Sequence, residues 1–97
     1  MTYTFFVLSK AQQEILSAWE WYEDKQPELG DRFKRELAKK IKSILDNPLQ
    51  YPLKGRFHEV KTDDFPYLIV FKIDEKRNQI LIVSVFHTSR NPAKKHK

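Results

Sequence analysis

The sequence predicts an α+β fold in which an antiparallel sheet carries an N-terminal helical hairpin on one face, in the order β-α-α-β-β-β. Two adjacent patterns with helical periodicity occupy most of the first half of the chain. Strand patterns occupy the second half, where two runs of β-branched and aromatic residues flank a polar connector at residues 74–79. The chain of 97 residues has the size of one domain, which we predict to span residues 1–90.

Residues 3–8 form a short apolar run that predicts the first strand. Ser9 and Gln12 have the spacing of a capping box, which predicts that the Ser9 side chain caps the first helix. This helix carries one apolar stripe and is predicted to end near Pro27. The stripe comprises Ala11, Ile15, Ala18, Trp19 and Tyr22.

The second helix is predicted to have Pro27 at its first position, where a missing N–H is tolerated, and to end at Asn47 and Pro48. Its apolar stripe is the most regular pattern in the chain and comprises Leu29, Phe33, Leu37, Ile41, Ile44 and Leu45. Because few residues separate the two helices, they should run antiparallel to each other.

A loop at residues 49–55, a strand at 56–61 and a turn at 62–64 are predicted to lead into a hairpin formed by 65–73 and 80–87. Both hairpin strands are apolar on both faces; strict alternation places Ile80, Ile82 and Phe86 opposite Leu81, Val83 and Val85. A layer of two helices covers only one face, so the other should expose an apolar patch of the kind that binds partners. A heterologous partner, a homodimer and a helix that wraps further all remain open interpretations.

Composition indicates a protein of the cytoplasm. The chain has no cysteine, no signal-peptide pattern, and no apolar run near the roughly 18 residues that span a bilayer. The net charge is +5, but without the tail from Arg90 onward 14 basic residues face 13 acidic ones. We predict that residues 91–97 form a flexible basic tail. No zinc or calcium ligand spacing and no phosphate-binding glycine loop occur, so we expect no metal and no cofactor.

Five motifs occur in an order and spacing that resemble the RelE/ParE superfamily of bacterial toxins. They are Trp21-Tyr22-Glu23, Leu29-Gly30-xx-Phe33, Asn47-Pro48-xx-Tyr51-Pro52, the run FPYLIVF at 65–71, and Val85-Phe86-His87-xx-Arg90-Asn91-Pro92. The resemblance covers residues 3–92 and implies the same element order. It also implies a cognate antitoxin that wraps the toxin and neutralises it.

The resemblance leaves two targets open. RelE-like toxins cleave mRNA in the ribosomal A site without a metal, whereas ParE-like toxins lack the nuclease residues and poison DNA gyrase. The FPY and HxxR signatures resemble the ParE side and the plasmid stabilization group, which implies inhibition of gyrase. Asp63 and Asp64, which would repel phosphate, and the lack of a carboxy-terminal tyrosine count against nuclease activity. An inactive relative that acts as a protein-binding module is a further alternative.

Candidate site residues follow from these alternatives. If the protein is RelE-like, the resemblance implies Arg56, His58, His87 and Arg90 as catalytic residues, since acid–base groups and cations serve metal-independent RNA cleavage. Arg56 and His58 share a strand parity and should face the same side. A histidine that ends a buried strand is nonetheless more often a packing residue.

Candidate residues for binding the antitoxin or the target are Arg56, Tyr67, Arg90, Arg32, Arg35 and Lys39. The last three form, with Lys42, a basic stripe on the second helix, which could also be a solvated face.

Overall fold

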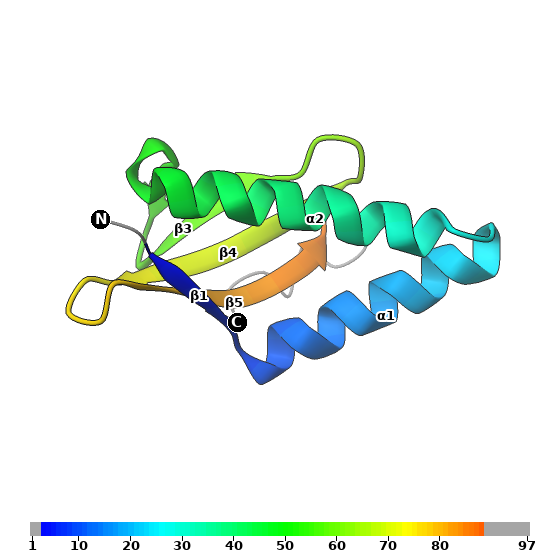
Figure 1. Ribbon diagram of the computed structural model, residues 1–97, viewed down its shortest axis with the longest axis horizontal. Coiled ribbons are helices and arrows are strands. Elements are labelled where there is room, and N and C mark those ends of the chain that lie inside the picture. The colour runs from blue at the N-terminus through cyan, green and yellow to red at the C-terminus, as the bar shows by residue number, and fades with distance from the viewer. Residues whose placement is uncertain (1–2, 89–97) are drawn as a thin grey trace.

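The computed structural model describes residues 3–88 of the chain, and the predicted tail at 91–97 lies outside them. It contains two helices and a five-stranded sheet (Figure 1). The elements are β1 (Thr4–Val7), α1 (Ser9–Lys25), α2 (Leu29–Asp46), the 3-10 turn η1 (Pro48–Gln50), β2 (Leu53–Lys54), β3 (Phe57–Lys61), β4 (Tyr67–Asp74) and β5 (Gln79–His87). This confirms the α+β fold class and the predicted order. Neither described helix combines the length and apolar character needed to cross a bilayer.

The sheet has the strand order β1-β5-β4-β3-β2 and is mixed. Its β2–β3, β3–β4 and β4–β5 pairs are antiparallel. However, β1 runs parallel to β5, with Thr4 opposite Gln79 and Val7 opposite Ile82, so the prediction of a wholly antiparallel sheet was wrong for this pair. Parallel neighbours need a long connection, which the rest of the domain supplies here. A short strand, β2, also lies within the predicted 49–55 loop.

The helix starts differ from those predicted. The N-cap of α1 is Leu8 and makes no side-chain cap bond, so the predicted Ser9 capping box was wrong. The Gln12 side chain instead donates from Nε2 to the carbonyl of Val7 at 2.8 Å. Pro27 does not open α2 either, because Glu28 takes a left-handed backbone conformation with a φ of 71° and the helix begins only after it.

The turn between the helices is closed by polar contacts. The Glu23 carboxylate accepts backbone N–H bonds from Glu28 and Asp31, each at 3.2 Å, at the start of α2. The Trp19 indole donates to the Asp31 carboxylate at 3.0 Å. A carboxylate near the first turn of a helix also interacts favourably with the helix dipole. These contacts hold the two helices together at the end where Gly30 lies.

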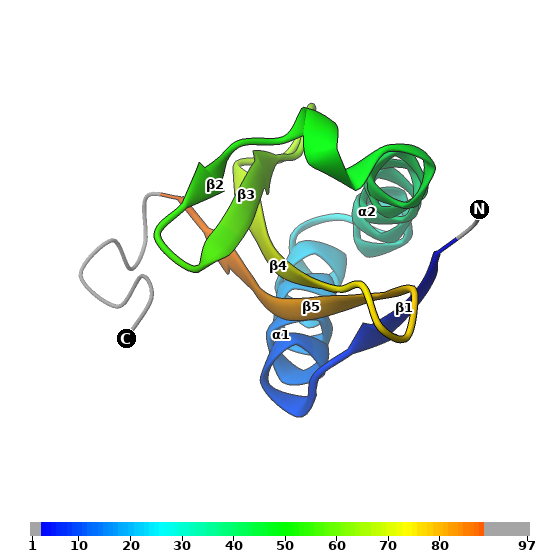
Figure 2. The ribbon, with the colours of Figure 1, turned by 90° about the vertical axis from the view of Figure 1, so that its left-hand side faces the viewer.

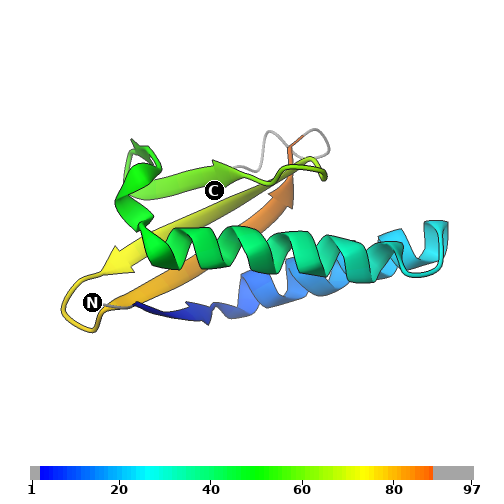
Figure 3. The same ribbon diagram turned by 45° about the horizontal axis from the view of Figure 1, so that its top comes forward.

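The helices contact different parts of the sheet. The strands curve around α2 in Figure 2, and α2 runs across them in Figure 3. By contrast, α1 lies along β5 beyond the point where β1 ends, and its Glu14 Oε1 accepts the Val85 N–H and the Ser84 hydroxyl, each at 2.9 Å. Part of the edge of β5 is thus covered by a helix instead of a strand.

One cluster of buried side chains joins both helices to one face of the sheet. Its largest fully buried members are Tyr67, Phe33, Phe71, Ile44, Ile69, Ile80 and Ile82. A register shift between β4 and β5 places Ile82 opposite Phe71 but Val85 opposite Ile69, which leaves Val83 as an extra residue. The predicted strict alternation of β5 was therefore wrong: Ile82 and Val85 lie together in the core.

Candidate functional site

The Phe65-Pro66-Tyr67 motif forms a tight connection between β3 and β4. The Tyr67 N–H donates to the Phe65 carbonyl at 2.8 Å, and the Thr62 N–H donates to the Tyr67 carbonyl at 2.9 Å. The Thr62 hydroxyl donates to the Phe65 carbonyl as well. Thr88, just after β5, donates its N–H to the Pro66 carbonyl at 2.8 Å. The motif therefore links the ends of three strands.

Tyr67, a predicted binding residue, is a core residue in the structure, with 2% of its surface exposed. Its ring packs against Phe33 at a centroid distance of 4.9 Å and meets the His87 ring edge-on at 5.3 Å. Tyr67 consequently contributes to the surface only as part of the wall of the groove between α1 and β5.

The structure describes three of the four predicted catalytic residues, and two of these, His58 and His87, lie apart. Arg56 precedes β3, in the turn after β2, so it does not share a strand face with His58. His58 lies opposite Phe71, and His87 lies opposite Tyr67. Those two β4 residues are separated by about 13 Å along the strand, at roughly 3.3 Å per residue. Arg90 lies outside the described residues.

The His58 side chain is held by packing and by one hydrogen bond. Its ring stacks on Phe71, with a centroid distance of 5.0 Å and an interplanar angle of 13°. Its Nδ1 lies 3.0 Å from the Tyr51 carbonyl oxygen, and since a carbonyl only accepts, Nδ1 carries the proton. The Tyr51 hydroxyl is in turn 2.7 Å from the Ser43 hydroxyl on α2. These contacts connect the loop after α2 to the sheet.

The two acids before the FPY motif pair with the second helix. Asp64 lies 3.6 Å from Arg32, and Asp63 lies 3.3 Å from Lys40. The Arg32 guanidinium also lies over the Phe65 ring, 5.8 Å from its centroid. Both acids thus form ion pairs between the β3–β4 loop and α2, a role that their positions in the sequence did not indicate.

The rest of the predicted basic stripe on α2 is open to solvent. Lys39 makes a loose pair with Glu36 at 3.9 Å, with 75% of its side chain exposed. Arg35 and Lys42 are exposed and make no ion pair within residues 3–88. They remain available to an acidic partner, as does Arg56.

The sheet face away from the helices carries lysines on three strands. Lys61 and Lys72 alternate with the buried Val60 and Phe71, which places them on this face. Lys54 pairs across it with the buried Glu59 at 3.9 Å. The predicted apolar residues of this face, such as Leu68 and Phe86, are half-buried among the described residues, and Val70 is only 2% exposed.

Of the six large exposed apolar side chains in residues 3–88, three lie together between β1 and the two helices. Phe5, Phe6 and Leu16 are 46%, 53% and 53% exposed. Two adjoining hollows of about 450 and 340 Å³ share Phe5, Ile15 and Lys34 in their walls. We call them together the β1 groove; its other lining residues include Leu37, Ile41, Lys42 and Leu45. The sequence contained one indication of this groove: the run at residues 3–8 is apolar on both faces, although it forms an edge strand.

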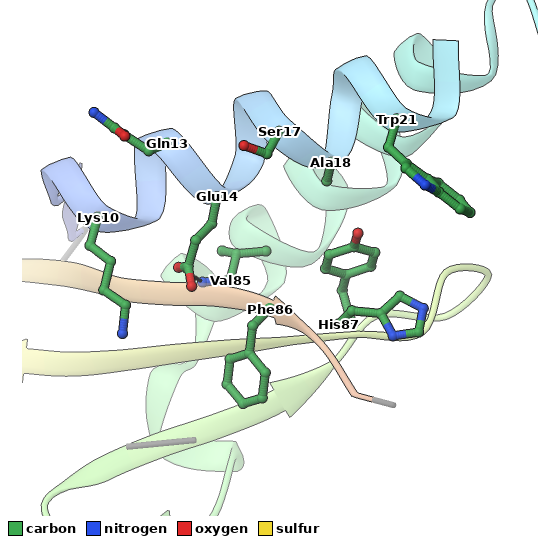
Figure 4. Close-up of a pocket in the computed structure, with 10 residues that line it drawn as sticks. Lys10, Gln13, Glu14, Ser17, Ala18, Trp21, Val85, Phe86 and His87 are labelled. Carbon is green, nitrogen blue, oxygen red and sulfur yellow. Dashed lines mark hydrogen bonds between the residues drawn. The ribbon is translucent and has the colours of Figure 1, made fainter. Parts of the chain in front are cut away.

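A second hollow, the α1–β5 groove, has a volume of about 510 Å³ and is shown in Figure 4. Its lining combines polar side chains of α1 with the end of β5: Lys10, Gln13, Glu14, Ser17, Ala18, Trp21, Tyr67, Val85, Phe86 and His87. Of the predicted site residues, His87 and Tyr67 meet here. Within residues 3–88, no three His, Asp or Glu side chains come together as a metal site would need.

Comparison with known proteins places the chain in a family. A model of the family described as the ParE toxin of the type II toxin–antitoxin system parDE matches residues 6–92. Comparison with curated proteins gives no significant match.

Solved structures share the fold. A chain from the chromosomal ParDE system of P. aeruginosa has a TM-score of 0.75 at 12% identity, over 88% of this chain and 95% of that one. A free double mutant of the E. coli toxin RelE has a TM-score of 0.72 at 19% identity, over 95% and 90% of the two chains. A chain of the intact E. coli RelBE toxin–antitoxin complex has a TM-score of 0.67 at 21% identity, over 91% and 99%. With the family model covering most of the sequence, the protein belongs to the ParE toxin family of type II toxin–antitoxin systems.

Proposed function

We propose that this toxin inhibits bacterial growth in the cytoplasm by binding DNA gyrase, and that it does so without cleaving RNA. The observation that carries the proposal is the dispersal of the candidate catalytic groups. Acid–base catalysis needs its groups within hydrogen-bond reach of one reacting site. The positions of His58 and His87 instead differ by about 13 Å along the strand direction, and the His58 ring is stacked on Phe71 with Nδ1 bonded to a carbonyl.

We further propose that a cognate antitoxin covers the β1 groove. This groove contains the large exposed apolar side chains Phe5, Phe6 and Leu16 beside β1, the edge strand of the described sheet. Exposed apolar surface of this kind commonly marks a protein interface. Lys34 and Lys42 flank the groove, so a segment with apolar anchors between acidic residues would match it in both shape and charge. The RelBE complex among the similar structures is an assembly of toxin with antitoxin.

One observation favours a second candidate function, ribosome-dependent mRNA cleavage of the RelE type. The open sheet face carries Lys54, Lys61 and Lys72, and cations on one face are suited to hold phosphate groups. Against this, Glu59 is buried among them and pairs with Lys54.

Two assays on the purified protein separate the candidates. Inhibition of gyrase supercoiling, with intact mRNA in a cell-free translation reaction mapped by primer extension, is the expected result. Codon-phased cuts that need ribosomes would replace the proposal with the nuclease. A protein that neither inhibits growth nor affects either assay would be an inactive relative that acts as a binding module.

The antitoxin surface is tested by exchanging an exposed apolar residue for a polar one. Phe6→Ser should weaken binding of the co-expressed antitoxin by about tenfold or more, as the loss of an aromatic anchor does. Leu49→Ser, at a residue 68% exposed in η1 and outside both hollows, is the matched control. Equal antitoxin affinity for both variants would place the interface elsewhere, with Arg56, Arg35 and Lys39 as the next residues to replace.

A further inference from the structure

The α1–β5 groove has an acidic centre in a basic protein. Among the described residues that line it, Glu14 is the one carboxylate. In Figure 4 the Glu14 side chain points from α1 down to β5, between Lys10 and the aromatic end formed by Trp21 and His87. The rest of the polar lining, Gln13 and Ser17, is neutral.

The Glu14 carboxylate is held in place yet has binding capacity left over. Its Oε1 accepts both the Val85 N–H and the Ser84 hydroxyl, at 2.9 Å each. A carboxylate offers about four acceptor positions on its two oxygens. Within residues 3–88 no donor bonds Oε2, and no cation lies within ion-pair distance of it. A fixed acceptor of this kind binds a cationic donor without losing side-chain entropy of its own.

The end of the groove opposite Lys10 is aromatic. Trp21 is 41% exposed, and the Lys25 ammonium already lies 4.8 Å from the centroid of its ring. Trp21 lies seven residues after Glu14, about 10 Å along the helix axis, so a guanidinium bound at Glu14 does not also lie on this ring, which already has a cation beside it. The aliphatic stem of an arginine bound at Glu14 would pack on the apolar lining of the groove, which includes Ala18.

Lys10 is the one lysine among the described lining residues, and its position bears on which sign of charge the groove favours. It lies one turn of α1 before Glu14 and forms no ion pair with it. Trp21 lies eleven residues after Lys10, about 16 Å along the helix axis. The Lys25 ammonium lies over the Trp21 ring at the far end, but between Glu14 and Trp21 no described residue that lines the groove is a lysine. A phosphate there would meet a carboxylate, so a nucleic acid is disfavoured.

We propose that the α1–β5 groove receives a basic side chain, most suitably an arginine, from the toxin's target protein, with Glu14 Oε2 binding the guanidinium. The target is chosen over the antitoxin because the antitoxin is assigned to the β1 groove. In that respect the inference rests on the proposed function.

Two substitutions of opposite expected sign test the binding itself. The probe is N-acetyl-arginine amide, with N-acetyl-glutamine amide as the neutral control, titrated while the Trp21 indole and Val85 amide resonances are followed by NMR. Glu14→Gln keeps an oxygen for Ser84 and Val85 but removes the charge, and should weaken binding of the arginine probe about fivefold. Lys10→Ala should strengthen it up to about twofold, because a like charge is removed. Glu20→Gln, at an exposed carboxylate outside the groove, should change nothing.

No localised shift in the wild-type protein, or equal affinity in Glu14→Gln, would overturn the inference. If phosphate bound more tightly to Glu14→Gln and more weakly to Lys10→Ala than to the wild-type protein, the groove would be an anion site instead. In cells, Glu14→Gln should lose growth inhibition while it keeps its melting temperature and antitoxin affinity. If Glu14→Gln loses growth inhibition but the wild-type toxin does not inhibit supercoiling, the proposed role of the groove is supported and the gyrase proposal is wrong. If the wild-type protein and Glu14→Gln inhibit supercoiling equally, the proposed role of the groove is wrong and the gyrase proposal is supported.

Discussion

Gly30 is the position where a single added methyl group should do most harm to the helical hairpin. A Cβ built there would lie 2.6 Å from the Trp19 backbone oxygen, 2.7 Å from Glu23 Cγ and 2.8 Å from Trp19 Cδ1. Because one of these atoms belongs to the backbone of α1, the strain cannot be relieved by a side-chain rotation alone. Moving α2 away would also lengthen the two bonds that Glu23 accepts from its first turn.

We therefore expect Gly30→Ala to destabilise the protein. Overpacking of this kind costs about 1–3 kcal/mol, and the preference of a helix for alanine over glycine returns about 0.5–1 kcal/mol. The net loss of about 1–2 kcal/mol should lower the melting temperature by about 5–15 °C in a domain of this size. Circular dichroism during thermal and urea unfolding measures both quantities.

The matched control is the other glycine. A Cβ built on Gly55 would have no atom within 4 Å, but the backbone φ there is +66°, so its requirement is conformational and not steric. Gly55→Asn should change the free energy of unfolding by less than about 0.5 kcal/mol, because asparagine tolerates left-handed backbone. A Gly30→Ala protein as stable as wild type would refute the close packing of α1 on α2 at this turn.

Three further substitutions separate core, backbone and surface effects, and urea unfolding measures each. Phe33→Ala should cost about 3–5 kcal/mol, since the ring is 1% exposed among three aromatic neighbours, and a loss under 1 kcal/mol would contradict that packing. Glu28→Gly should stabilise the protein by up to about 1 kcal/mol by relieving the left-handed backbone, whose φ is 71°; a loss of stability would show that its side chain contributes. Arg32→Ala should cost under about 1 kcal/mol, because its pair with Asp64 is half-exposed, and this cost should shrink in 1 M salt.

Patterns that depend on neighbouring residues predicted their elements well. The apolar stripe of α2 predicted its buried face, since Phe33, Leu37, Ile41 and Ile44 all lie in the core. The β-branched runs likewise predicted β4 and β5. Helix ends were less accurate, because Ser9 and Pro27 fit a start pattern that the backbone at Leu8 and Glu28 does not follow.

The candidate site was harder to predict because it depends on register. Parity along β3 suggested that Arg56 and His58 face together, but the strand begins at Phe57 and leaves Arg56 in the turn. The contacts of His58 come from Tyr51 and Phe71, which only the folded chain brings near.

By itself, then, the sequence determined the fold class, the order of elements and the superfamily, because these follow from local periodicity and from motifs spaced along the chain. Only the tertiary structure decided the parallel pairing of β1 with β5, the bulge at Val83, and the position of α1 along the β5 edge. Those features determine which apolar and charged side chains reach the surface. They arise from contacts such as that between Glu14 and Val85, which are 71 residues apart, and no local pattern specifies which distant partner a residue will find.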